Sequence, residues 1–169
     1  MDEFYKQFIE SDGKPIIYNE QELIALDRLN VPKNFELLVR LISTNSEWRQ
    51  GIRLSVNKGK LISNVDDKRL ARTAGKKFVI WEDFFDIIPE DRYIGKSTDG
   101  QLVIYNSWQR GTELEGSDSW FGNAAMIKKE IRKDVYRYEC NDGHLDYNFD
   151  DIIFEIEIKE LNKKSNYRL

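Results

Sequence analysis

The stretch IIFEIEI, residues 152–158, is the part of this sequence that predicts the fold most clearly. Every second residue is large and apolar, namely Ile152, Phe154, Ile156 and Ile158. Glu155 and Glu157 occupy the positions between them, so the two kinds of side chain point to opposite faces of an extended chain. This period of two predicts a β-strand with one face in the core and the other turned outward.

The segment HLDYNFDD, residues 144–151, precedes this strand and is rich in oxygen ligands. Its spacing Asp146-x-Asn148-x-Asp150 is how an EF-hand loop begins. An EF-hand is excluded because Asp151 stands where that loop needs glycine, and because the extended strand carries Glu157 away from the other ligands. We expect a polar turn that leads into a core strand, with a Ca²⁺ site formed by the turn as the alternative. The candidate ligands are Asp142, Asp146, Asn148, Asp150 and Asp151.

The same segment resembles the DFDDLV or DFNDLVF ending of several bacterial β-sandwich domains of otherwise unknown function. The matching residues are Asp146, Phe149, Asp150, Asp151, Ile152, Ile153 and Phe154, and YECNDG, residues 138–143, looks like part of the same ending. The resemblance covers about twenty residues and implies a β-sandwich. Some of those domains are secreted and associated with calcium, so the resemblance also implies a possible calcium association.

From Asn34 onward, short apolar segments alternate with turn residues, which is typical of an all-β domain. We expect strands over 35–43, 101–108 and 152–158, a hairpin formed by 51–56 and 60–65 with Gly59 at positive φ, and a central strand over 76–85. Residues 124–131 and 135–140 predict a second hairpin, with a helix over 125–135 as the alternative. The chain is therefore predicted to be mainly β, as a β-sandwich or jelly-roll-like domain.

The first thirty-three residues differ from the rest because two segments favour helix. Residues 3–11 carry Phe4 and Phe8, and residues 19–30 begin with a capping-box pattern of Asn19 and Glu22. We expect one domain, with a helical extension over 1–33, the sandwich over 34–161 and a frayed tail over 162–169.

Composition limits the classes of function. The 169 residues carry a net charge of −4, which gives no basic footprint for nucleic acid. Cys140 is the only cysteine, so no disulfide forms within the chain. The N-terminus lacks an apolar signal segment and no run reaches the length of a membrane span. We therefore expect a cytoplasmic protein with no membrane partner, with export by a route that needs no N-terminal signal as the alternative.

Two segments offer candidate binding residues. The stretch 106–126 holds Trp108, Arg110, Trp120 and Asn123, a combination that suits recognition of protein or sugar, unless both tryptophans fill the ends of the core. The stretch 81–91 offers acidic residues, among them Glu82, Asp83 and Asp86, to a basic partner. The alternatives are a solvated strand edge and a glycosidase-type pair of carboxylates.

Residues with the usual chemistry of catalysis are few. His144 is the only histidine, so a zinc site or a Ser-His-Asp triad would depend on it alone. Cys140, four residues earlier, shares a strand face with Tyr136 and Tyr138 and is expected to be a buried thiol. The sequence therefore favours a bacterial protein-binding module without catalytic activity, specifically an immunity or inhibitor protein that neutralises a toxin and needs no cofactor. The alternatives are a calcium- or carbohydrate-binding β-sandwich and a carboxylate-dependent hydrolase.

Overall fold

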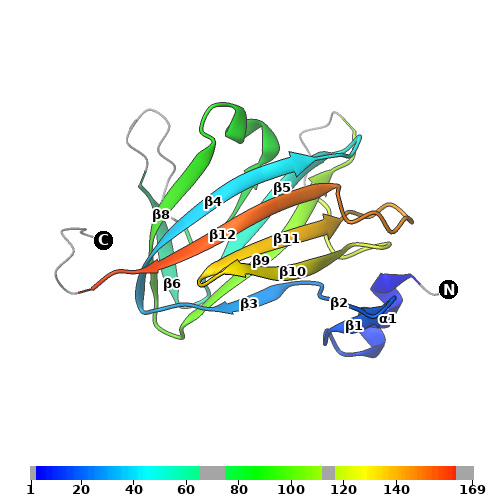
Figure 1. Ribbon diagram of the computed structural model, residues 1–169, viewed down its shortest axis with the longest axis horizontal. Helices are drawn as coiled ribbons and strands as arrows, with labels where there is room; N and C mark the ends of the chain where they lie inside the picture. Colours follow the sequence, from blue (N-terminus) through cyan, green and yellow to red (C-terminus); the bar gives the residue numbers. More distant parts are fainter. Residues whose placement is uncertain (1–2, 65–74, 112–116, 163–169) are drawn as a thin grey trace.

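A computed structural model describes residues 3–64, 75–111 and 117–162 (Figure 1). Within these residues the chain is mainly β, with helix α1 (Phe4–Glu10) near the N-terminus and a 3₁₀ helix, η2 (Glu82–Asp86). The strands are β1 (Ile16–Tyr18), β2 (Gln21–Leu23), β3 (Asp27–Asn30), β4 (Asn34–Thr44), β5 (Arg49–Ser55), β6 (Gly59–Ser63), β7 (Lys77–Trp81), β8 (Glu90–Ser97), β9 (Gln101–Gln109), β10 (Ala125–Arg132), β11 (Val135–Asn141) and β12 (Ile152–Glu160).

The strands form two large antiparallel sheets that lie face to face (Figure 1). One has the order β10-β11-β12-β4-β8-β6 and the other the order β3-β9-β5-β7, and β1 and β2 form a separate hairpin. The apolar faces of the two large sheets enclose the main hydrophobic core. The predicted mainly-β sandwich is therefore confirmed.

Strand β12 lies inside the six-stranded sheet, paired with β11 on one side and β4 on the other. Its alternating apolar residues, Ile152, Phe154, Ile156 and Ile158, are all buried. Phe35, Leu37 and Val39 of β4 are buried beside them. The period of two in 152–158 thus identified both the strand and the face that it turns to the core.

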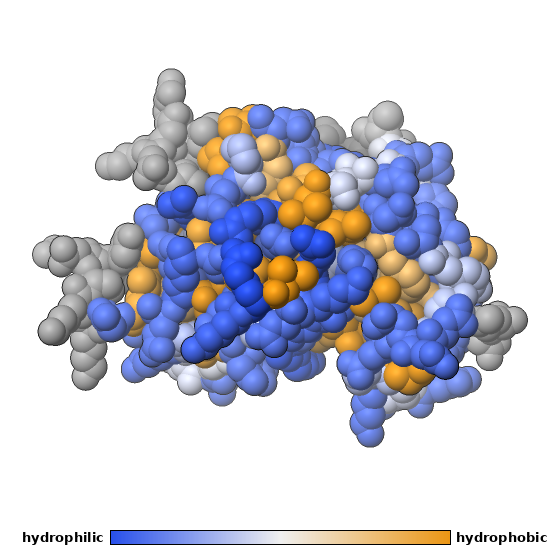
Figure 2. Space-filling model, viewed as in Figure 1, coloured by the Kyte–Doolittle hydropathy of each residue, from blue (hydrophilic) through white to orange (hydrophobic). Residues whose placement is uncertain are grey.

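The outer face of the six-stranded sheet is covered by paired charges. Glu157 of β12 lies 3.4 Å from Arg40 and 3.2 Å from Arg132, and Glu155 lies 3.0 Å from Arg137. Figure 2 shows this face as largely hydrophilic, with groups of apolar residues between the charged ones. Burial raises the pKa of Glu157, but the charges of the neighbouring cations outweigh burial and hold this pKa below its usual value. The face is therefore an ion-pair network of both signs.

Three predictions about strand arrangement are wrong. Strands β5 and β6 do not pair, because β5 belongs to the four-stranded sheet and β6 to the six-stranded one. Strand β7 is not central, because it ends the four-stranded sheet beyond β5. Residues 19–30 form β2 and β3 and not a helix, because pairing with β1 and β9 overrides the capping-box pattern. The hairpin of β10 and β11 is confirmed, and its helical alternative is excluded.

The N-terminal residues form a small second core against the edge of the six-stranded sheet. Its members are Phe4, Phe8, Ile16, Leu23, Ala125 and Ile127. Ile24 exchanges both backbone hydrogen bonds with Met126, which extends the sheet beyond β10 by one bridge. Among the described residues, no helix is long and apolar enough to cross a membrane.

Candidate functional site

Three connections and helix α1 meet at one end of the sandwich, which we call the loop end. They are residues 45–48, 110–124 and 142–151, of which 112–116 lie outside the described residues. The Tyr5 amide donates to the Gly122 carbonyl at 3.1 Å, and the Asn123 side-chain amide donates to the Asp146 carbonyl at 3.1 Å. Gly122 has φ +61°, and a Cβ there would lie 2.2 Å from the Gly143 oxygen, so only glycine allows this close approach.

Trp120 combines a positive φ with an exposed aromatic side chain. Its φ of 57° lies in the left-handed region, which is a rare conformation for a bulky side chain. The indole Nε1 donates to the Ala25 carbonyl at 3.1 Å, and the ring packs on Tyr105 with centroids 4.5 Å apart. The side chain still remains 42% exposed. Trp120 is therefore an exposed aromatic residue whose orientation is fixed before any ligand arrives.

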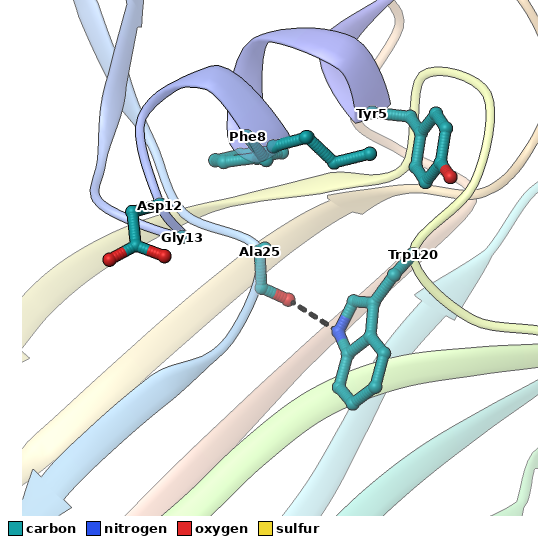
Figure 3. A pocket seen from close by; sticks show the side chains of 7 residues that line it. Tyr5, Phe8, Asp12, Gly13, Ala25 and Trp120 are labelled. Atoms are coloured by element: carbon teal, nitrogen blue, oxygen red, sulfur yellow. Dashed lines mark hydrogen bonds between the residues drawn. The ribbon is translucent and has the colours of Figure 1, made fainter.

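An open apolar pocket lies between Trp120 and helix α1, and we call it the Trp120 groove (Figure 3). Its volume is about 370 Å³. The lining residues are Tyr5, Phe8, Ile9, Asp12, Gly13, Ala25 and Trp120. A pocket of this size falls at the lower end of the range of roughly 300–1,000 Å³ that is common for ligand sites. The groove therefore has the size and the apolar lining of a small binding site.

Helix α1 contributes to the groove because it carries more apolar residues than its core contact uses. Phe4 and Phe8 lie four residues apart and are buried in the second core. Tyr5 and Ile9 form a second pair with the same spacing, and both are exposed. This helix of seven residues therefore carries two apolar stripes, one facing the second core and one exposed.

A polar network centred on Asp142 occupies the other side of the loop end. The buried Asp142 carboxylate accepts hydrogen bonds from Ser46 Oγ at 2.6 Å and Gln50 Nε2 at 3.0 Å. Its Oδ1 lies 2.6 Å from His144 Nδ1, and His144 Nε2 lies 2.9 Å from Glu47 Oε1. We call this set of five residues the Asp142 network. It joins the β4–β5 connection to the β11–β12 connection.

Burial lowers the pKa of His144, whereas its hydrogen bonds to Glu47 and Asp142 raise it. The hydrogen bonds and the two negative charges outweigh burial, so the pKa of His144 lies above its usual value. The imidazole also stacks on Trp48, with centroids 3.6 Å apart. An aspartate that orients a histidine is the arrangement of a general base, but Ser46 bonds to Asp142 and the histidine nitrogens face only carboxylates. The network therefore contains no nucleophile activated by the histidine.

Asp151 lies beneath the network and is nearly inaccessible. Burial raises its pKa to about 7, the hydrogen bond from the Asp142 amide opposes this rise, and the charges of Asp142 and Asp146 add to it. The amide nitrogen of Asp142 lies 2.8 Å from Asp151 Oδ2. The carboxyl of Asp151 therefore holds a proton near neutral pH more readily than an ordinary aspartate.

The structure separates the predicted binding residues of 106–126. Trp108 is fully buried and belongs to the core, and Asn123 is buried and bonds to the Phe4 amide at 3.2 Å. Arg110 pairs with Asp118 at 2.6 Å and lies over the Phe121 ring. Trp120 alone among these residues lines the groove.

The predicted acidic residues of 81–91 lie together on η2, outside the groove. Asp83 bonds to two guanidinium nitrogens of Arg49, at 2.6 and 2.8 Å. Glu82 accepts from Thr44 Oγ1 and from the Gln50 amide. Asp86 is exposed. Two of these three carboxylates are therefore engaged within the fold.

The lining of the Trp120 groove includes one carboxylate, that of Asp12, whereas the acid/base pair of a glycosidase requires two.

The side chains of the predicted Ca²⁺ ligands have different surroundings in the structure. Asp142 uses both oxygens within its network, Asp150 Oδ2 accepts from Asn45 at 2.9 Å, and Asn148 is exposed. The Oδ1 atoms of Asp146 and Asp150 are buried and have no hydrogen-bond partner among the described residues. In residues 3–64, 75–111 and 117–162, no group of three or more His, Cys, Asp or Glu side chains is placed to hold a metal ion. Calcium binding stays a prediction.

Cys140 is buried in the main core, as expected from its strand face, and burial raises the pKa of its thiol well above the usual value. Sequence reasoning missed Tyr5, Ile9 and Asp12 of the groove and Glu47 of the network. The second apolar stripe of α1 was a signal for the first two. Glu47 gave none, because it lies 97 residues from His144 in the chain.

The comparisons with known proteins add no assignment, because no family model, curated protein or solved structure matches this chain significantly.

Proposed function

We propose that this chain is a non-enzymatic protein-binding module whose Trp120 groove receives an apolar side chain from a segment of a partner protein. The observation that carries the proposal is Trp120 itself. Its exposed ring is held by a hydrogen bond and a ring contact on a backbone with positive φ. Such a conformation costs on the order of 1–3 kcal/mol and is concentrated at functional sites.

The groove has the properties of an anchor pocket in an interface. Binding energy in interfaces is concentrated in a few residues, often tryptophan and tyrosine, that surround a desolvated contact. Tyr5 and Phe8 extend from helix α1 on one side of the groove, and Trp120 and Ala25 lie on the other side (Figure 3). Because Trp120 is already oriented, a partner does not have to order it, which removes part of the entropic cost of binding.

The more specific proposal of an immunity or inhibitor protein rests on the net charge of −4 and on a site suited to binding without catalysis. The carboxylates of η2 that bond within the fold do not support this proposal. The residues around the groove determine which charge a partner segment can carry there.

Two exposed isoleucines offer a matched test. Ile9 lines the groove and Ile87 follows η2, and each is 61% exposed. The wild-type protein would serve as bait for affinity capture from an extract of the cells that express this chain. The captured protein would then be purified for calorimetric titration. We expect Ile9→Ser and Trp120→Asn to weaken binding at least about tenfold, which corresponds to about 1.4 kcal/mol. Asparagine is chosen because it tolerates the backbone conformation of residue 120.

Ile87→Ser should change affinity less than about twofold, since substitutions away from an interface have small effects. Equal affinity for all four proteins would show that the groove is not the binding site, and failure of the wild type to capture any protein would contradict the binding module. A captured toxin whose activity is suppressed on binding would support the immunity proposal.

A further inference from the structure

The Trp120 groove continues into a second hollow with a different chemistry. This hollow has a volume of about 290 Å³, and it shares Asp12, Gly13, Ala25 and Trp120 with the apolar part. Its other lining residues are Lys14, Leu26 and Arg28. Trp120 thus stands between an apolar hollow on the side of α1 and a hollow that carries two cations.

The two cations of this hollow are open to solvent. Lys14 and Arg28 are both exposed, and in the part of the chain that the structure describes neither side chain forms an ion pair. Other cations on the sheet surface differ in this respect, since Arg40, Arg137 and Lys129 each pair with a glutamate. Asp12, on the shared wall, offsets one of the two positive charges, so the far end of the groove keeps a positive excess.

From this juxtaposition we infer that the groove binds a protein segment in which a large apolar side chain is followed within one or two residues by an acidic side chain. The apolar side chain fills the hollow of Tyr5, Phe8 and Ile9. The carboxylate lies against Lys14 and Arg28, where it forms charge-assisted hydrogen bonds. This inference rests on the proposed function of the groove and adds the chemistry of the segment that it selects.

Complementary charge fits the observations better than an apolar partner alone. A purely apolar ligand would leave both cations unpaired next to a desolvated contact, and a basic segment would be repelled by them. The apolar hollow supplies most of the affinity, and the cations supply selectivity. The charge of the docking segment can differ from the partner's net charge, because only the residues next to the bound apolar side chain meet Lys14 and Arg28.

A displayed library of random twelve-residue peptides, panned against the wild-type protein, gives the first test. Peptides that lose binding to Trp120→Asn define the ligands of the groove. We expect these peptides to share an aromatic or large aliphatic residue with Asp or Glu one or two positions away. Trp120-dependent peptides without acidic residues would overturn the inference and leave the proposed binding function intact. Absence of any Trp120-dependent peptide would contradict both.

A charge-reversal experiment gives the second test, with synthetic peptides that differ only next to the anchor. The peptides Gly-Ser-Phe-Asp-Glu-Ser-Gly, Gly-Ser-Phe-Asn-Gln-Ser-Gly and Gly-Ser-Phe-Lys-Lys-Ser-Gly carry an acetylated N-terminus and an amidated C-terminus, so side chains hold their only charges. We expect the acidic peptide to bind the wild type about three- to tenfold more tightly than the neutral one, with the difference decreasing as salt rises.

The double variant Lys14→Glu/Arg28→Glu should reverse this order and prefer the lysine peptide. The matched control is Lys60→Glu/Lys96→Glu, which makes the same change in net charge on two exposed lysines that lie opposite each other on β6 and β8. The control should keep the preference for the acidic peptide. Equal reversal by both double variants would show that only net charge matters, and an unchanged preference in the Lys14/Arg28 variant would refute the role of these two cations. Thermal unfolding of each variant establishes that it is folded.

Discussion

Trp120 shows at the scale of one residue how local strain and surrounding structure produce a binding surface. The Nε1 hydrogen bond to Ala25 and the Tyr105 contact hold the indole in place. Both partners come from other segments of the chain, so the strained backbone persists because the fold over-determines it. Trp108, twelve residues earlier, has the same side chain and a fully buried position. The residue type alone therefore does not identify the anchor.

Asp151 carries the sharpest prediction about pH. Its pKa is about 7 in the folded protein, against an ordinary value of 3.8. The folded state therefore binds a proton more tightly than the unfolded state, and the free energy of unfolding should fall as pH rises from about 4 through 7. The raised pKa of His144 acts in the same direction, with its contribution lost as pH rises above the ordinary value of 6.5.

Asp151→Asn replaces the carboxyl by a neutral group of the same shape that can still accept from the Asp142 amide. We expect this variant to match the wild type at pH 4 and to be more stable by about 1–3 kcal/mol at pH 8. Denaturant titrations at both pH values measure the difference. Asp86→Asn, which changes an exposed aspartate of η2, is the control and should leave the pH profile unchanged. A wild-type stability that rises between pH 5 and pH 8 would contradict the role assigned to Asp151.

At the scale of elements, the connection between β5 and β6 crosses from one sheet to the other. The sequence pattern of two short strands around Asn-Lys-Gly is typical of a hairpin, but β5 pairs with β7 and β9, and β6 pairs with β8. Gly59 has a different role from the one predicted, because its φ is not positive. A Cβ at this position would lie 1.7 Å from the Lys96 carbonyl oxygen, so Gly59 is needed where β6 meets β8.

This close approach predicts a clear cost for Gly59→Ala. The added methyl group must push β6 away from β8, and overpacking of this kind costs about 1–3 kcal/mol of unfolding free energy. Gly75→Ala is the matched control, because its Cβ would meet only a Phe78 ring atom at an ordinary 3.6 Å. The control should be unchanged or gain up to about 1 kcal/mol from a less flexible unfolded chain. Equal stabilities of the two variants in denaturant titration would rule out the close contact.

At the scale of the molecule, the protein has a large core between the sheets and a smaller one beneath α1. The smaller core holds the helix that lines the Trp120 groove. Phe4 is fully buried there, with ring centroids 5.2 Å from Tyr18 and 5.6 Å from Tyr147. Because the two cores share no residue, we expect the groove to depend on a unit that can open while the sandwich remains folded.

Phe4→Ala and Phe154→Ala make the same chemical change in the two cores. Each should lower the free energy of unfolding of its own unit by about 3–5 kcal/mol. In amide hydrogen exchange, Phe4→Ala should reduce protection in α1, β1 and β2 while protection in β4 and β12 remains. Phe154→Ala should reduce protection throughout. A uniform loss of protection in Phe4→Ala would show that the two cores unfold as one unit.

The features that depend on neighbours along the chain were predictable from the sequence. Alternation at 152–158 and at 35–43 identified β12 and β4, and the turn at 132–134 identified the β10–β11 hairpin, because side-chain period and turn chemistry are local properties. The buried state of Cys140 followed in the same way from the face of its strand. The short helix α1 was also predictable, since Phe4 and Phe8 have the spacing of one helical face.

Which segments of the chain meet in space became clear from the three-dimensional fold. It separated β5 from β6, converted residues 19–30 into strands, and exposed Trp120 while it buried Trp108. It also brought His144 to Glu47 and Lys14 to the side of Arg28 and Trp120. The physical reason is that backbone pairing and burial of large side chains act between residues far apart in the chain, and these contacts outweigh local preferences of less than about 1 kcal/mol per residue.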